Sequence, residues 1–208
     1  MTRIEWFAKE DRTYESGLDR GVIYPYNGWG VSWNALVNVD NKQSQNANTT
    51  IYYEGVPFDI EDEYADRTST VTAFTYPGVL DELCGMAADE NGFGYLFGDQ
   101  KREFFSMSYR TMIEQGPDYK IHVLINQKAR MTGQPRGTHT ETFGPTNFTW
   151  ELTGVPALIM NRNTTYVVLD SRNILKSRMA LIEDLLYGTP TRDPDFKDFL
   201  AYLNGGVE

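Results

Sequence analysis

Few residues in this chain have the types and spacing that chemistry at a protein site requires. The two histidines, His122 and His139, lie far apart with no cysteine near either, and the only cysteine is Cys84. Protein zinc sites usually group four cysteine and histidine ligands, so this pattern argues against a zinc or similar metal site. A single cysteine also excludes an intramolecular disulfide. We therefore expect no metal and no cofactor, and we interpret His122 as a structural histidine on a strand.

The sequence also lacks the motifs of common enzymes. It contains no Gly-x-Ser-x-Gly nucleophile turn, no phosphate-binding loop and no Gly-x-Gly-x-x-Gly after a strand. Carboxylates are numerous, so their number alone does not exclude the pair of acidic residues that a glycosidase uses. None of them, however, stands alone on an apolar strand, where burial would raise its pKa. We therefore expect that the chain is not an enzyme.

Four aromatic or charged residues have two interpretations each. Trp29, Trp33 and Trp150 are typical of an aromatic core, although neighbouring aromatic faces can also form a platform for a sugar ring. Arg110 is expected to pair with an acidic residue, either within the fold or across a boundary between subunits. The sequence leaves these alternatives open.

Composition indicates one globular, β-rich domain. The 208 residues are 40% hydrophobic and 13% aromatic, and the formal net charge is -10 without a basic stripe, which argues against a tight nucleic-acid binder. The first residues, MTRIEWFAKEDR, lack the apolar run of a signal peptide. Since no stretch approaches the ~20 apolar residues of a membrane span, we expect a chain that folds in a cytoplasm.

The stretch from Phe104 to Asn126 predicts a long β-hairpin around a turn at Gly116-Pro117-Asp118, because apolar and polar residues alternate on both sides of the turn. One face is expected to pack a core and the other to meet water or another polar surface. The expected core residues are Phe105, Met107, Tyr109, Ile121, Val123 and Ile125. The expected polar face comprises Ser106, Ser108, Arg110, Lys120 and Asn126.

Shorter patterns predict the remaining elements. Strands are expected within residues 21–37, 67–76, 93–97 and 147–153, with hairpins at 49–60 and 155–169, a short helix within 79–88, and polar loops at 38–50 and 128–144. After residue 170 the apolar residues recur every three or four positions, as in a helix, rather than at every second position. Leu175, Met179, Ile182 and Leu186 predict a helix over Ser171–Tyr187, and a second helix follows Asp193 and Pro194.

The order of several short motifs resembles a known family. Between residues 50 and 175 the motifs are Ala73–Pro77, Cys84-Gly85, Gly98–Arg102, Ser108–Thr111, Tyr119–Val123, Phe148–Glu151 and Asp170-Ser171. Together they resemble the major tail proteins, or tail tube proteins, of long-tailed bacteriophages with non-contractile tails. The resemblance implies a mainly β fold, a β-sandwich or partial barrel with a long hairpin, in one domain over residues 1–208. Residues 21–170 would form the sandwich, and residues 171–204 the flanking C-terminal helices.

The resemblance also implies a structural role in the virion tail. Such subunits assemble in the bacterial cytoplasm into homo-oligomeric rings, usually of six, and the rings stack into a tube through which double-stranded DNA passes transiently. Partners would be the tape-measure protein and the tail terminator and distal tail proteins, with no membrane insertion by this chain. An acidic bore would repel DNA and prevent sticking, which agrees with the net charge of -10.

Two groups of residues become candidate sites under this resemblance. The polar face of the hairpin is expected to line the bore, through Ser106, Ser108, Arg110, Lys120 and Asn126. The polar loop is expected to contact the adjacent ring, through Asn41, Lys42, Gln43, Gln45, Asn46 and Asn48. Two alternatives remain: a tail terminator or distal tail protein that forms one ring and stops, and a monomeric carbohydrate-binding module that uses its tryptophans.

Overall fold

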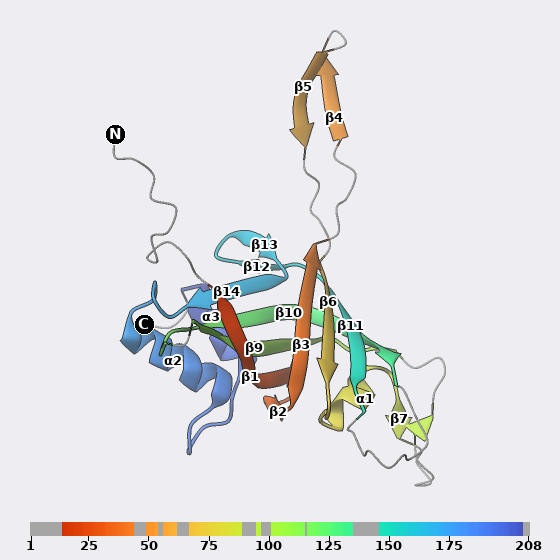
Figure 1. Ribbon diagram of the computed structural model, residues 1–208, viewed down its shortest axis with the longest axis vertical. Helices are drawn as coiled ribbons and strands as arrows, with labels where there is room; N and C mark the ends of the chain where they lie inside the picture. The colour runs from red at the N-terminus through yellow and green to blue at the C-terminus, as the bar shows by residue number, and fades with distance from the viewer. Residues whose placement is uncertain are drawn as a thin grey trace.

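One antiparallel sheet of eight strands carries most of the described chain (Figure 1). The computed structural model describes residues 14–43, 49–53, 56–61, 67–88, 95–96, 101–114, 116–134 and 146–205. Seven strands of the large sheet lie in the order β2 (Val31–Trp33), β1 (Glu15–Pro25), β9 (Phe105–Ile113), β10 (Tyr119–Gly133), β11 (Phe148–Gly154), β6 (Arg67–Ala73), β3 (Leu36–Gln43), and β14 (Tyr166–Asp170) also pairs with β10. The sequence prediction of a mainly β chain with two C-terminal helices is confirmed.

Three small hairpins and three helices complete the described elements. The hairpins are β4 (Thr49–Tyr53) with β5 (Val56–Glu61), β7 (Ala87–Ala88) with β8 (Tyr95–Leu96), and β12 (Ala157–Ile159) with β13 (Arg162–Thr164). The helices are α1 (Val79–Leu83), α2 (Lys176–Tyr187) and α3 (Phe196–Leu203). No helix in the described part of the chain is long and apolar enough to cross a membrane.

Strand β10 is the central strand of the sheet. Along one side it pairs with β9, which confirms the predicted long hairpin, and along the other it pairs first with β14 and then with β11. The strand continues to Gly133, so the prediction of a loop from residue 128 is wrong for residues 128–133. The physical reason is the alternation of Lys128 and Arg130 with Ala129, which is fully buried opposite Leu152.

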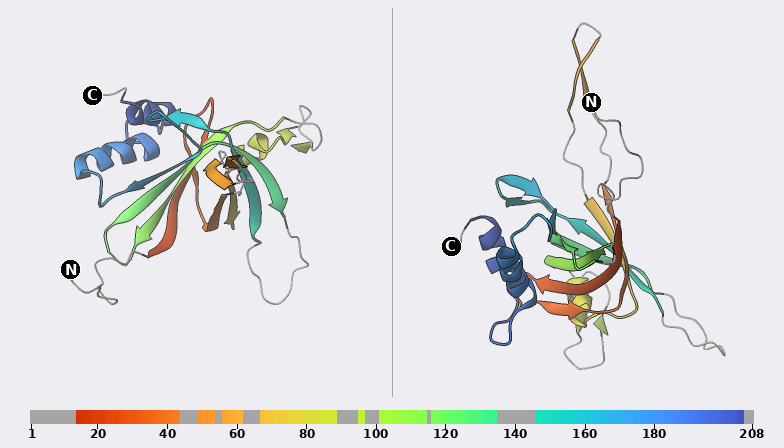
Figure 2. Two further views of the ribbon diagram at one scale, coloured as in Figure 1. Left: turned by 90° about the horizontal axis from the view of Figure 1, so that it is seen from above. Right: turned by 60° about the vertical axis from the view of Figure 1, so that its left-hand side comes forward.

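The sheet curls strongly (Figure 2), and its end strand β3 comes into contact with β1. Gly21 on β1 allows this approach: a Cβ at this residue would lie 2.6 Å from Leu36 Cδ1 and 2.5 Å from the Trp33 carbonyl oxygen. Within the described residues no ladder joins β1 to β3, so the sheet stays an open, curled structure rather than a closed barrel.

Both faces of the sheet are buried over its middle. The concave face encloses an aromatic core, whose members include Trp33, Val71, Met107, Leu124, Trp150 and Leu152. The convex face packs against α2 and α3, and its core includes Val22, Ile121, Val123, Ile182, Leu186 and Phe199. The sequence predicted one buried and one polar face for the hairpin, and this prediction is wrong because the C-terminal helices cover the second face.

The register of β9 and β10 decides which residues share a face. Met107 lies opposite Leu124, Tyr109 opposite His122, and Ser108 opposite Val123. Directly paired residues of antiparallel strands point to the same side of the sheet. The apolar residues of β9 therefore face the concave core, whereas Ile121, Val123 and Ile125 face the helices. The expectation that all six apolar residues form one core face is wrong, since alternation within a strand does not fix the register between strands.

The loop predicted at residues 38–50 is a strand over its first half. Asn41, Lys42 and Gln43 belong to β3 and pair with Ser69, Thr68 and Arg67 of β6. The sequence obscured this strand because its side chains are polar, and such residues have low intrinsic preference for strands. The backbone of β3 is nevertheless hydrogen-bonded along β6. This pairing forms the strand, although the hydrophobicity of its side chains does not predict it.

Helix α2 begins at Lys176 rather than at Ser171, and Leu175 at its N-cap is 67% exposed. The Ser171 hydroxyl instead accepts a hydrogen bond from the backbone N–H of Tyr119 at 3.0 Å. The predicted end at Tyr187 is confirmed, and Gly188 follows it with a φ of +77°. Helix α3, predicted to follow Asp193 and Pro194, begins after Asp195, and the Asp195 carboxylate caps it by accepting from the backbone N–H of Lys197.

A pair of substitutions in α2 tests this correction. Ile182 is 3% exposed in the helix core, so Ile182→Ala should lower the free energy of unfolding by about 2–5 kcal/mol. Leu175→Ala removes an exposed side chain of similar size and should change the free energy of unfolding by less than about 0.5 kcal/mol. Urea unfolding followed by circular dichroism measures both. Equal losses for the two variants would contradict the described start and facing of α2.

Candidate functional site

The two serines of the predicted bore lie beneath the C-terminal helices. Ser106 is 4% exposed and Ser108 is fully buried on the convex face. The Ser108 hydroxyl lies 2.9 Å from the Tyr24 hydroxyl, which itself donates to the Leu186 carbonyl oxygen of α2 at 2.6 Å. In this subunit Ser108 therefore links the sheet to α2 through Tyr24, whereas the Ser106 hydroxyl accepts a hydrogen bond from the Asn126 backbone N–H at 3.2 Å.

Arg110 finds its acidic partner within the fold. Its guanidinium donates two hydrogen bonds to the Asp19 carboxylate of β1, from Nε at 2.8 Å and from Nη2 at 2.6 Å. Such a planar two-bond pair is stronger and more specific than a single contact. The hydrogen bonds from Arg110 hold the pKa of Asp19 below its ordinary value. The described subunit thus resolves the two sequence alternatives in favour of an internal pair.

Of the remaining predicted bore residues, Lys120 lies on the other face of the sheet and Asn126 lies beside Ser106. Lys120 is opposite Thr111 on the other face of the sheet, where its ammonium contacts Glu15 at 2.6 Å. Asn126 lies at a bulge of β10 with a φ of +49°. The expectation that Ser106, Ser108, Arg110, Lys120 and Asn126 share one polar face is therefore wrong, and the β9–β10 register is the physical reason.

The predicted contact loop is only partly within the described chain. Asn41 lies on β3, where its amide donates to the Tyr109 hydroxyl at 2.7 Å and its carbonyl accepts from Ser69 at 2.7 Å. Lys42 forms an ion pair with Asp40 at 3.2 Å. Gln43 ends β3, and Gln45, Asn46 and Asn48 lie outside the described residues. Asn41 therefore contributes to the interior of the subunit.

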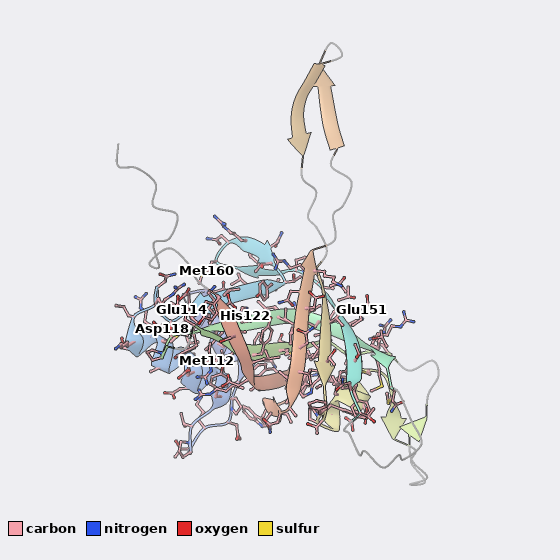
Figure 3. All side chains as sticks on the ribbon, in the orientation of Figure 1. Met112, Glu114, Asp118, His122, Glu151 and Met160 are labelled. Carbon is pink, nitrogen blue, oxygen red and sulfur yellow. The ribbon has the colours of Figure 1, made fainter. Side chains whose placement is uncertain are left out.

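A polar cluster lines the gap between β1 and β3, and we call it the seam cluster. Its members are Glu15, Asn41, Ser69, Tyr109, Thr111, Lys120, His122 and Tyr166. His122, which Figure 3 labels on the large sheet, contacts several of these members, and its Nε2 lies 2.8 Å from the Thr111 hydroxyl and 3.3 Å from a Glu15 oxygen. Its Nδ1 lies 2.5 Å from the Tyr166 hydroxyl, and its ring stacks on Tyr109. The spacing of these residues along the sequence could not reveal the cluster, because its members come from six different strands.

Burial sets the charge state of the seam cluster. His122 is 7% exposed, and burial lowers its pKa, although the Glu15 carboxylate acts in the opposite direction. Burial tends to raise the pKa of Glu15, but hydrogen bonds from Lys120 and Thr111 hold it below its ordinary value. The cluster therefore joins a neutral imidazole to a Glu15–Lys120 ion pair, an arrangement that ties β1 to β9 and β10.

A second site is the aromatic pocket beside the β1–β2 turn, with a volume of about 320 Å³. Its aromatic walls are Tyr24, Tyr26, Trp29, Phe104, Phe105 and Phe196. Its polar residues are Asn27, Ser106, Asn126, Asp195 and Lys197. The turn is positioned by a hydrogen bond from the Gly30 N–H to the Pro194 carbonyl oxygen at 3.0 Å.

The three tryptophans discussed from the sequence separate in the structure. Trp33 and Trp150 are fully buried and meet edge to face with ring centroids 5.1 Å apart, which confirms the core interpretation for both. Trp29 is 59% exposed and lines the aromatic pocket. The sequence did not single out this pocket, because Phe104, Asn126 and Phe196 are brought to the turn only by folding.

The described residues contain no group of three or more histidine, cysteine or acidic side chains that could hold a metal ion. Comparison with known proteins adds no further information, since no family model and no curated protein matches the chain.

The seam cluster predicts how the stability of the subunit depends on pH. The pKa of His122 is lower in the folded state than the ordinary value of about 6.5, so the folded state binds fewer protons there. The stability linked to His122 is therefore complete above pH ~6.5 and is lost as the pH falls below that value. The same sign holds for Glu15 below its ordinary pKa of 4.5.

The variant His122→Gln should therefore lose less free energy of unfolding than the wild type between pH 7 and pH 5. Urea unfolding at both pH values measures the difference, and an NMR titration of the His122 ring reports its pKa directly. A pKa at or above the ordinary value, or an unchanged pH dependence in the variant, would contradict this assignment.

Proposed function

We propose that this chain is a structural, non-enzymatic subunit that assembles into stacked rings, forming the tail tube of a long-tailed bacteriophage with a non-contractile tail. One observation carries the proposal: the described subunit joins an open, curled antiparallel sheet to a projecting hairpin that pairs with no other strand. This arrangement agrees with the order of motifs that resembles tail tube proteins. It presents the kinds of surface that neighbouring copies would complete.

The sheet supplies free edges for such contacts. Strand β2 ends the sheet at one side, and β14 lies along β10 without a further strand beside it among the described residues. Unpaired strand edges favour pairing with another chain. Head-to-tail contacts that repeat around an axis close into a ring when the rotation closes, and closure removes the free edges.

The β4–β5 hairpin supplies a second surface. It projects beyond the end of β3 and β6, away from the large sheet (Figure 1), and the right-hand view of Figure 2 shows the same separation. A two-stranded hairpin alone is marginally stable in water. The proposal is that an adjacent ring covers it, so that the hairpin, rather than Asn41 and Lys42 on β3, provides contacts between rings.

Electrostatics supports passage of DNA rather than binding. Each copy carries a formal net charge of -10, and a ring of six would carry six times that charge. Double-stranded DNA carries about one negative charge per 1.7 Å of its axis, so an acidic bore would repel it. The same proposal includes several features that come from the resemblance alone. These are the number of subunits in a ring, assembly in the host cytoplasm, and the tape-measure, terminator and distal tail partners. The description of the sheet as a β-sandwich of the tail-tube type is also part of this proposal.

Two alternatives predict different assemblies. A tail terminator or distal tail protein would form one ring and stop. A stand-alone carbohydrate-binding module would stay monomeric, and burial of Trp33 and Trp150 removes two of the three tryptophans from the platform it would use. We therefore propose the stacked assembly as the principal function.

Negative-stain electron microscopy of the purified protein tests the proposal. At high protein concentration we expect hollow tubes or stacked rings. Single closed rings would favour a terminator or distal tail component instead. If only monomers remain when the protein is concentrated and mixed with a tape-measure and tail-tip preparation, the tail-tube proposal is wrong.

A shortened variant tests the hairpin. Replacing residues 44–66 with a short Gly-Ser linker leaves β3 and β6 to form an ordinary hairpin, so the subunit should fold with a near-normal thermal midpoint but form no stacked rings. As a matched control, Met160→Ser alters an exposed residue at the tip of a different hairpin, β12–β13, and should preserve stacking. Normal tubes from the shortened variant would overturn the role given to the hairpin.

A further inference from the structure

The aromatic pocket is preformed by contacts that do not depend on a ligand. Tyr24 in its wall is 2% exposed and held by hydrogen bonds to Ser108 and Leu186, and its ring lies 5.0 Å from that of Phe196. Phe105 is 1% exposed. Because these walls are fixed by the core, a ligand would bind without the cost of ordering them.

The exposed side of the pocket carries aromatic surface that the described subunit does not cover. Tyr26 is 66% exposed and Trp29 is 59% exposed, on the turn between β1 and β2. Large aromatic side chains usually bury most of their surface, and an exposed pair beside a pocket is typical of a binding site. A flat ring face of this kind suits the C–H face of a sugar ring, which is also flat and apolar.

The polar side of the pocket offers both donors and acceptors. Asn126 lies at the β10 bulge in the left-handed region, a conformation that is uncommon outside glycine and that often marks functional positions. Its backbone is held by Ser106 and by the Val155 N–H, while its amide borders the pocket. An amide both donates and accepts, which is what two neighbouring hydroxyl groups require.

Charge at the rim narrows the class of ligand. The Lys197 ammonium lies 5.5 Å from the Tyr26 ring centroid, and the Lys128 ammonium lies 4.3 Å from that of Phe104. These two cations already occupy aromatic faces, so a quaternary ammonium or other cationic ligand would be repelled. Asp195, the one carboxylate among the described residues that line the pocket, is engaged in capping α3.

We propose that the aromatic pocket binds a saccharide, with the sugar ring stacked on Trp29, beside Tyr26, and its hydroxyl groups toward Asn126. The volume of about 320 Å³ accommodates one neutral or acidic sugar unit, or the end of a longer glycan. The site goes beyond the proposed structural function and does not depend on whether the subunits polymerise.

A titration of the full-length protein with glucose, N-acetylglucosamine and glucuronic acid tests the site. We expect saturable shifts of the Trp29 indole and Asn126 amide resonances in ¹H–¹⁵N NMR spectra for at least one sugar, with a Kd in the millimolar range. Trp29→Ala should weaken binding at least ~10-fold, since stacking on an aromatic face is lost. Asn126→Asp, which keeps a side chain that tolerates the left-handed region, should also weaken it.

Phe74→Ala is the matched control, because Phe74 is an exposed aromatic residue outside the pocket, and it should leave the titration unchanged. Absence of saturable shifts with all three sugars would overturn the proposal, as would shifts that persist unchanged in Trp29→Ala. If Trp29→Ala abolishes tube formation while the wild type shows no saccharide shifts, the pocket is a contact between copies and the proposal is wrong. Tube formation by electron microscopy is read separately, so the two proposals can fail independently.

Discussion

The pairing of β9 with β10 is the interaction on which the rest of the structure depends. This strand pair is the wall shared by two cores, the aromatic core on the concave side and the helix core on the convex side. Its register places Met107 with Leu124 on one side and Ser108 with Val123 on the other. A slip of one residue would exchange the two faces and leave both cores unfilled.

The same register explains why polar side chains are so deeply buried. Ser108 is fully enclosed but bonds to Tyr24, and His122 is nearly enclosed but bonds to Thr111 and Tyr166. Buried polar groups are tolerated when they are hydrogen-bonded. In the seam cluster these bonds hold β1, β3 and β10 near one another where, among the described residues, no backbone ladder closes the sheet.

Irregularities of the sheet determine the second site. The bulge at Asn126 interrupts the regular pairing of β9 and β10 beside the β1–β2 turn. Phe196 of α3 forms another wall of the aromatic pocket there. Bulges commonly occur beside functional sites because they redirect a side chain while keeping the strand paired on both sides. The open edges and projecting hairpin serve the proposed assembly, whereas the aromatic pocket lies on a separate part of the subunit surface.

The sequence alone determined the elements with strong apolar periods: the β9–β10 hairpin, the strands around residues 67–73 and 148–154, and the two C-terminal helices. It favoured an aromatic core for Trp29, Trp33 and Trp150 while leaving a sugar platform open, and the structure confirms the core for Trp33 and Trp150 but not for Trp29. The sequence missed β3, because the polar residues of this strand show no alternation of apolar and polar side chains. It also assigned Leu175 to the buried face of α2, because spacing alone does not show where a helix begins.

Only the tertiary structure decided which faces match, which residues form the seam cluster, and that Asn126 borders an aromatic pocket. The physical reason is that periodicity reports the environment along one strand or helix. Pairing register, the covering of one face by α2 and α3, and contacts such as His122 with Tyr166 join residues distant in the chain, and they are fixed by packing across strands rather than by local sequence.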